Sequence, residues 1–324
     1  MDALPPYQAT RSRSSATLTG IACGMGAGAL WGLVLLAPEL AREFNPLQLT
    51  IGRYLAYGAI ALALIAPRWR ELFGRVPRRQ WWTLCWLAMA GNTVYYLLLS
   101  SAVQSGGIAM TSLVIGFLPV TVTVIGSRDH GAVPLRKLLP SLLLCAAGIV
   151  CIAWQALAAP GGGSSGRQLF GLLCAVGALA SWTVFAVGNA RSLVRLPQVS
   201  SHDWNLLIGL MTGVQSVLLL PIAIAMGTDV TGMEAWVRFG VVSIGVAVLA
   251  SIVGNALWNR MSRLLPLTLV GQMIMFETVF ALLYGWLWEA RLPTALEILA
   301  LCFVVSGVLS CLMAHQSREN AAAH

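Results

Sequence analysis

Long apolar runs alternate with short polar turns along the whole chain. Each run has about 20 residues, the length at which an α-helix crosses the hydrocarbon core of a bilayer. The pattern predicts an all-α membrane protein with ten transmembrane helices, at residues 17–37, 48–67, 81–101, 107–126, 138–157, 168–189, 205–226, 236–258, 265–288 and 295–314. Residues 1–16 and 315–324 are expected to form the two terminal tails.

The low content of charged residues agrees with this interpretation. The 324 residues are 58% hydrophobic and 10% charged, whereas about a quarter of the residues in a soluble domain are charged. A net charge of +8 is compatible with a nucleic-acid partner, but the arginines lie in the turns between apolar runs. We therefore expect the lipid bilayer, and no nucleic acid, as a partner.

Basic residues also predict which ends of the helices face the cytoplasm. With the N-terminus inside, the cytoplasmic segments carry 15 of the 20 lysines and arginines, and the outside turns carry Arg42, Arg167, Arg238 and Arg291. The remaining arginine, Arg53, falls inside the second run. Because basic residues accumulate on the cytoplasmic side, both termini are expected there.

The two halves of the chain resemble each other. A shift of 151 residues places 20–31 on 171–182, with Gly20 on Gly171 and Trp31 on Trp182. A shift of 159 residues places helices four and five on helices nine and ten. The predicted halves are residues 17–157 and 168–314, joined by a glycine-serine linker at 158–167. Since each half has five helices, the second enters the membrane from the opposite side, which is an inverted repeat typical of alternating-access transporters.

A family resemblance rests on the stretch from Asn255 to Glu277, NALWNRMSRLLPLTLVGQMIMFE, followed by TVFALLYGWLWEARLPT and by Gly307. The first half has a counterpart in Arg53-Tyr54, Pro119 and Gly126. Over nearly all of residues 17–314, the sequence resembles the EamA-type carriers of the drug/metabolite transporter superfamily. The resemblance implies ten helices and the export or uptake of small metabolites. Thr278 stands where the family pattern has a proline.

Ionisable and amide groups inside the predicted helices are candidates for gating or coupling. Glu277 is the thirteenth residue of the ninth run, where a charge is costly. It is either a proton-coupling group or a gate, or it hydrogen-bonds to a neighbouring helix for structural reasons. Asn189 and Asn255 lie near the predicted inner ends and are expected to help close a cytoplasmic gate.

Other polar and aromatic residues within the runs are expected to line a substrate cavity, because lipid offers them no hydrogen bonds. Arg53 either binds a substrate carboxylate, or extends towards the outer surface, or pairs with Glu39 or Glu43 in the nearby turn. The two equivalent tryptophans either wall the cavity or serve packing. The predicted cavity residues are Trp31, Arg53, Tyr57, Asn92, Tyr95, Tyr96, Thr111, Trp182, Gln215 and Gln272.

Signatures of catalysis and of metal binding are absent from the sequence. The seven cysteines all lie in apolar runs, and the four histidines lack the spacing of a zinc site. No enzyme activity and no cofactor are therefore expected. The prediction is a secondary transporter of the bacterial inner membrane that moves an amino acid or similar zwitterion. Export is the favoured direction, protons are a candidate coupling ion, and a monomer or a dimer would serve. The alternatives are efflux of lipophilic drugs or cations, and a non-transporting scaffold or sensor.

Overall fold

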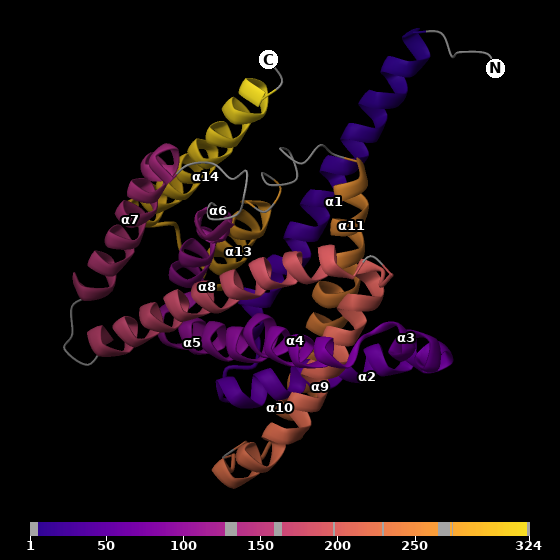
Figure 1. Ribbon diagram of the computed structural model, residues 1–324. Helices are drawn as coiled ribbons and strands as arrows, with labels where there is room; N and C mark the ends of the chain where they lie inside the picture. Colours follow the sequence, from indigo (N-terminus) through magenta and orange to yellow (C-terminus); the bar gives the residue numbers. More distant parts are fainter. Residues whose placement is uncertain are drawn as a thin grey trace.

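Apolar helices follow one another along the chain in the computed structural model, which describes residues 6–126, 135–158, 164–196, 198–228, 230–264, 273 and 275–322 (Figure 1). No strand occurs in these residues. Six helices in this part of the chain are long and apolar enough to cross a membrane: Leu18–Leu40, Pro46–Arg75, Arg78–Ile115, Gly166–Leu193, Ser201–Met226 and Met233–Met261. Met275–Trp288 and Ala295–Cys311 are shorter apolar helices. The all-α membrane class is thus confirmed, while the number of ten spans stays a prediction.

The first helices follow the expected runs closely. Helix α1 covers Pro6–Leu40 and so begins within the expected tail. Helix α2 covers Pro46–Ile65, and Asn45 caps it in a reciprocal arrangement with Gln48. The short helix α3, Trp69–Arg75, follows a turn of 3₁₀ helix. These caps explain why α2 begins where the apolar run begins.

The third and fourth expected runs meet at a break in one long element. Helix α4, Arg78–Ala88, leads through a π-helical segment η2, Met89–Thr93, into α5, Val94–Ile115, and then α6, Leu118–Gly126. Gly107 has φ = 86° inside α5, a conformation that glycine adopts without the strain of a side chain. The chain therefore turns at Gly107, between the two expected runs.

The second part of the chain also contains a π-helical segment. Its elements are α7 (Leu135–Ala158), α8 (Ser164–Arg195), α9 (Ser201–Met226), α10 (Met233–Val246), the π-helical η3 (Ala247–Gly254), α11 (Asn255–Leu264), α13 (Met275–Trp288) and α14 (Ala295–Ala322). Most of the first half of the ninth expected run lies outside the described residues.

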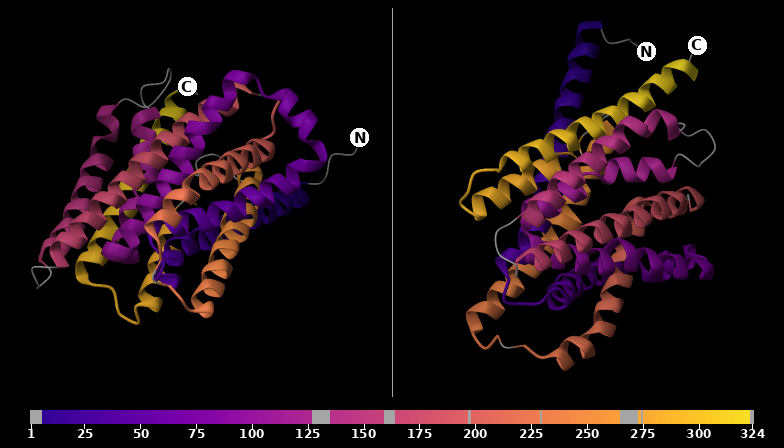
Figure 2. Two further views of the ribbon diagram at one scale, coloured as in Figure 1. Left: turned by 90° about the horizontal axis from the view of Figure 1, so that it is seen from below. Right: turned by 90° about the vertical axis from the view of Figure 1, so that its left-hand side faces the viewer.

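Four helix pairs make the most extensive contacts among the described residues: α1 with α13, α2 with α9, α5 with α8, and α7 with α14. The two views in Figure 2 show these helices packed side by side. At the crossing of α2 and α9, a Cβ on Gly58 would lie 2.6 Å from the Cα of Gly213. Two glycines thus allow the backbones of these helices to approach closely.

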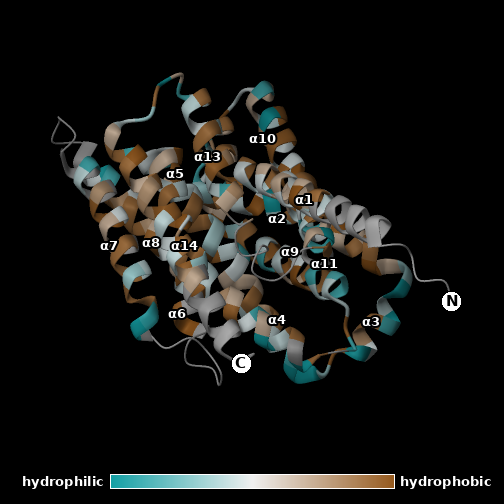
Figure 3. Cartoon of the chain, turned by 90° about the horizontal axis from the view of Figure 1, so that it is seen from above, coloured by the Kyte–Doolittle hydropathy of each residue, from teal (hydrophilic) through white to brown (hydrophobic). Residues whose placement is uncertain are grey.

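Large apolar side chains cover the outside of the molecule as well as its core. Leu218, Ile224 and Leu287 are all mostly exposed. Figure 3 shows hydrophobic residues along α5, α7 and α13, and hydrophilic residues on α3 and at helix ends. A soluble protein rarely exposes so much contiguous apolar surface, so these faces are suited to contact with lipid.

Candidate functional site

A buried arginine on α2 lies between two tyrosine rings. The guanidinium carbon of Arg53 lies 4.4 Å from the ring centroid of Tyr96 and 5.0 Å from that of Tyr54. The two rings pack edge to face, with centroids 5.8 Å apart. Only 8% of Arg53 is exposed. The ring faces stabilise the cation through cation–π attraction. This attraction does not satisfy the N–H groups of the guanidinium, which still require hydrogen-bond acceptors.

Two of the three guanidinium nitrogens of Arg53 lack a hydrogen-bond partner. Both Nε and Nη1 are buried and unpaired among the described residues. The expected pairing of Arg53 with Glu39 or Glu43 is wrong, because Glu39 pairs with Arg42 at 2.7 Å and Glu43 pairs with Arg238. A buried charged donor without a partner costs stability, so this arrangement favours an additional ligand.

Glu277 on α13 provides the opposite charge. A Cβ on Gly28 would lie 2.9 Å from the backbone nitrogen of Glu277, so glycine lets α1 hold this part of α13 closely. The Glu277 side chain is half-buried, and Arg53 is the cation that acts on it electrostatically. No ion pair joins the two within 4.0 Å in the described part of the chain. The two charges are therefore neighbours without direct contact.

Tyr95 and Tyr96 connect the two charges along α5. Both are buried, at 7% and 2% exposure. Tyr95 interacts electrostatically with Glu277, and Tyr96 with Arg53. Successive side chains on a helix point about 100° apart, which lets this tyrosine pair face both charges. We call Arg53, Tyr54, Tyr95, Tyr96 and Glu277 the central cluster.

A second polar layer surrounds the π-helical segment η2. Asn92 donates to Thr212 Oγ1 at 3.0 Å, and Thr93 donates to Gln215 Oε1 at 2.6 Å. Gln215 donates in turn to the backbone oxygen of Cys85 at 2.8 Å. These bonds join η2 to α9, which contains Gln215. Asn92 and Gln215 therefore already have hydrogen-bond partners within the protein.

The two equivalent tryptophans have different surroundings. Trp31 donates through Nε1 to the backbone oxygen of Ala250 at 3.1 Å, and its ring lies 5.0 Å from that of Trp258. Trp182 packs edge to face on Phe185, with centroids 5.7 Å apart. Both are half-buried. Trp31 therefore has a specific bond to η3, whereas Trp182 has a packing contact.

The other predicted site residues bond to backbone or to distant side chains. Tyr57 donates to the backbone oxygen of Asn205 at 2.9 Å, and Thr111 to that of Gly107 at 2.9 Å. Asn189 accepts from Trp204 at 2.8 Å, and Asn255 donates to the backbone oxygen of Ser251 at 2.8 Å. Gln272 lies outside the described residues. These bonds do not join Thr111, Asn189 or Asn255 to the central cluster.

Tyr54 and Thr212 are not among the predicted site residues. Tyr54 stood next to Arg53 in the family resemblance, which was the one available signal. Successive side chains on a helix point to different sides, so the sequence does not predict that Tyr54 contacts Arg53. In the structure the long side chain of Arg53 reaches across the Tyr54 ring. Thr212 carried no signal beyond being polar in an apolar run.

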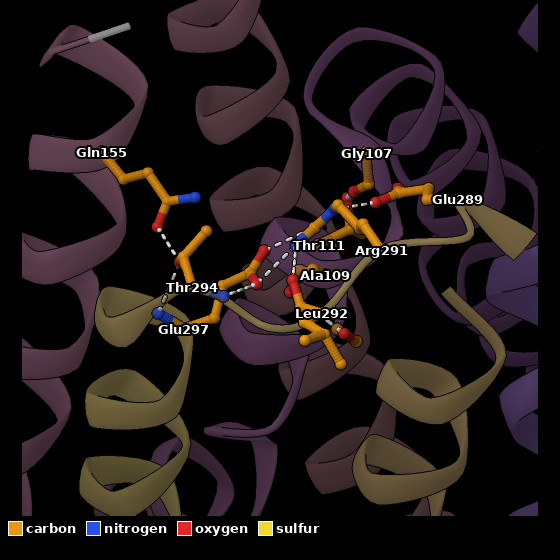
Figure 4. A network of polar contacts seen from close by, with 10 residues as sticks. Gly107, Ala109, Thr111, Gln155, Glu289, Arg291, Leu292, Thr294 and Glu297 are labelled. Atoms are coloured by element: carbon orange, nitrogen blue, oxygen red, sulfur yellow. Dashed lines mark hydrogen bonds and ion pairs between the residues drawn. The ribbon is translucent and has the colours of Figure 1, made fainter. Parts of the chain in front are cut away.

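A polar network closes the end of the molecule where α13 turns into α14 (Figure 4). Arg291 donates to both carboxylate oxygens of Glu297, at 2.6 and 2.7 Å, and to Glu289 at 2.5 Å. The hydrogen bonds that Glu297 accepts, and then the one that Glu289 accepts, raise the pKa of the Arg291 guanidinium above its ordinary value. Thr294 links the network to Gln155 on α7 at 3.1 Å.

The network lines a half-open cavity of about 510 Å³ whose wall also includes Gly107 and Trp154. The Arg291 cation is paired here with two carboxylates, and Thr294 and Glu297 cap α14 reciprocally. The arrangement thus fastens the turn between α13 and α14 to α7. It differs from the central cluster, where the cation has unpaired donors.

Comparison with known proteins gives three findings. The EamA-like transporter family matches residues 18–154. The inner membrane protein YtfF of Escherichia coli (strain K12) is 31% identical over 310 residues, which cover 90% of this chain and 94% of that protein. A protein crystal structure that is 22% identical has a TM-score of 0.59 and covers 94% of this chain and 99% of its own, which shows a shared fold.

Proposed function

The chain belongs to the EamA-like transporter family of the drug/metabolite transporter superfamily, and on that premise we propose that it is a secondary transporter that moves a small metabolite by alternating access. The observation that carries this proposal is the central cluster. It joins α2 and α5 of the first expected half to α13 of the second. Charged residues inside membrane-spanning segments are expensive and mark transport pathways.

The arrangement of helices supports an inverted repeat of five helices each. Exchanging the two halves turns the contact of α1 with α13 into a contact of α8 with α5, and it leaves the pairs α2 with α9 and α7 with α14 unchanged. These are the most extensive contacts of the described residues. Substrate sites of such transporters lie near the midplane between the two halves. Glu277 is the thirteenth of 24 residues along its predicted helix and so lies near this depth, while Arg53 is the sixth residue of its predicted helix and lies nearer the outer surface.

The two π-helical segments support the same symmetry. A shift of 159 residues carries Met89–Thr93 onto residues 248–252, inside Ala247–Gly254. Each segment accepts a hydrogen bond from the first helix of the other half, from Ser181 to the Ala90 oxygen at 2.7 Å and from Trp31 to the Ala250 oxygen at 3.1 Å. π-Helical segments are frequent at functional sites, and we propose that this pair bends as access alternates.

The substrate that this cluster suits best is an amino acid or a similar zwitterion. A cation and an anion lie near each other without a direct ion pair, and tyrosine rings surround the cation. A lipophilic cation would meet the unneutralised charge of Arg53, which disfavours drug-cation efflux. We propose export from the cytoplasm across the bacterial inner membrane, with both termini cytoplasmic and with protons coupled through Glu277.

Counterflow in proteoliposomes tests the proposal. Purified protein is loaded with unlabelled amino acids and given a panel of labelled ones, with and without a pH gradient. Wild type is expected to accumulate at least one of them. Glu277→Gln is expected to keep counterflow but to lose the response to the gradient, because its amide cannot take up a proton.

The matched control is Glu234→Gln, the same chemical change at a carboxylate that is 95% exposed. It should keep both activities. Loss of both activities in Glu277→Gln would assign Glu277 a structural role instead of coupling. If wild type accumulates no amino acid, the proposed substrate class is contradicted. Efflux of lipophilic cations would then be the favoured hypothesis, followed by a scaffold or sensor role.

A further inference from the structure

Arg53 is the residue of the central cluster with buried donors that lack a hydrogen-bond partner among the described residues. Its side chain is buried, and Nε and Nη1 lack partners among the described residues. An arginine guanidinium stays protonated in proteins and has five N–H donors. The missing interaction therefore has to come from an anion or a neutral acceptor.

The protein's own carboxylates do not fill this role. Glu39 and Glu43 are held by Arg42 and Arg238. Glu277 acts on Arg53 electrostatically but forms no ion pair with it in the described part of the chain. The faces of the Tyr54 and Tyr96 rings lie beside the guanidinium, and a side-chain hydrogen bond links Arg53 to Tyr96. Nε and Nη1 remain available for another acceptor.

We propose that Arg53 is the anchor for the carboxylate of the transported molecule. This inference rests on the proposed transport function and adds the group that decides which molecules are accepted. A carboxylate forms short, charge-assisted hydrogen bonds with a guanidinium. Contact with the faces of the Tyr54 and Tyr96 rings keeps the guanidinium in place, so little side-chain freedom is lost on binding.

Thermal unfolding in detergent tests the anchor with defined probes. The panel contains the twenty L-amino acids, their amides, which keep the ammonium group but lack the carboxylate, and 4-methylpentanoate, which keeps only the carboxylate. A ligand that binds the folded protein raises the melting temperature. Wild type is expected to bind an amino acid about 100-fold more tightly than its amide, since a site built for a polar group rejects ligands that leave it unpaired.

Three variants make the test specific. Arg53→Gln is expected to bind the amino acid about 100-fold more weakly and no better than its amide. Arg53→Lys keeps the charge and should restore part of the preference. Arg238→Gln, which removes an exposed arginine from its pair with Glu43, should behave like wild type.

The ligand-free protein gives a second measurement. Because an unpaired buried charge is unfavourable, Arg53→Gln is expected to raise the melting temperature without ligand. If Arg53→Gln instead lowers the melting temperature by more than Arg238→Gln does, Arg53 has a structural role and the proposal is overturned.

The remaining outcomes separate the anchor from the transport proposal. If amino acids bind wild type and Arg53→Gln keeps the preference over amides, the anchor is wrong while the proposed function stands. If no carboxylate-bearing compound binds wild type or shows counterflow, the anchor and the proposed substrate class are both wrong.

Discussion

At the scale of single residues, Trp31 supports the π-helical segment η3. Its Nε1 donates to the Ala250 oxygen, and its ring lies against Gly254, where a Cβ would approach Nε1 to 2.8 Å. Trp31→Phe keeps an aromatic ring but removes the donor from a part-buried carbonyl. We expect the free energy of unfolding to fall by about 1–2 kcal/mol, measured as a lower melting temperature in detergent.

Trp182→Phe is the control for Trp31→Phe, because it is the same change at the equivalent position of the other half. The contact of Trp182 with Phe185 is an edge-to-face packing that phenylalanine can also make. The loss should therefore be smaller. Equal losses in the two variants would mean that ring size, and not the bond to Ala250, makes Trp31 important.

At the scale of elements, the crossing of α2 and α9 depends on paired glycines. A Cβ on Gly58 would lie 2.6 Å from Gly213 Cα, and one on Gly213 would lie 2.7 Å from Gly58 Cα. Because both neighbours are backbone atoms, the helices would have to move apart. We expect Gly58→Ala to destabilise the protein by about 1–3 kcal/mol and to lower the rate of counterflow.

Gly240→Ala provides the comparison for Gly58→Ala within another helix. A Cβ on Gly240 would meet nothing within 4 Å, so only the helix propensity changes, and alanine is favoured by about 1 kcal/mol. The melting temperature should stay the same or rise. A melting temperature of Gly58→Ala as high as that of Gly240→Ala would show that the two helices are not in close contact.

At the scale of the whole molecule, the polar turns gather at two ends. Arg42 and Arg167 both donate to the Gln104 oxygen, at 3.2 and 2.9 Å. At the other end, Arg68 pairs with Asp203 at 2.5 Å and Gln198 donates to the Arg75 oxygen. Figure 1 shows the start of α1 and the end of α14 on the same upper side. The cytoplasmic location of this side stays a prediction from the basic residues.

Cysteine labelling tests that sidedness. In a variant without the seven native cysteines, Gly166→Cys is expected to react with a membrane-impermeant maleimide in intact cells whose outer membrane is permeable. Gly74→Cys should react only after the inner membrane is opened. A Cβ at either glycine meets nothing within 4 Å, so neither change should disturb folding. The reverse labelling pattern would place both termini outside.

The sequence by itself determined the apolar helices, their polar ends and the two charges inside them. These features follow from local rules. The thickness of the bilayer sets the length of an apolar run, and a charged residue within such a run can be recognised from the sequence alone. The family resemblance was also visible, in residues such as Arg53-Tyr54 and the stretch ending at Glu277, and the comparisons confirm it.

Only the tertiary structure decided which groups meet. Trp31 and Ala250 are 219 residues apart, and the edge-to-face rings beside Arg53 come from two different helices. The pairing of Glu39 and Glu43 with Arg42 and Arg238 left Arg53 without an ion pair among the described residues. Such contacts depend on how distant helices pack against one another, and a pattern along one helix contains no information about the rotation and depth of its neighbours.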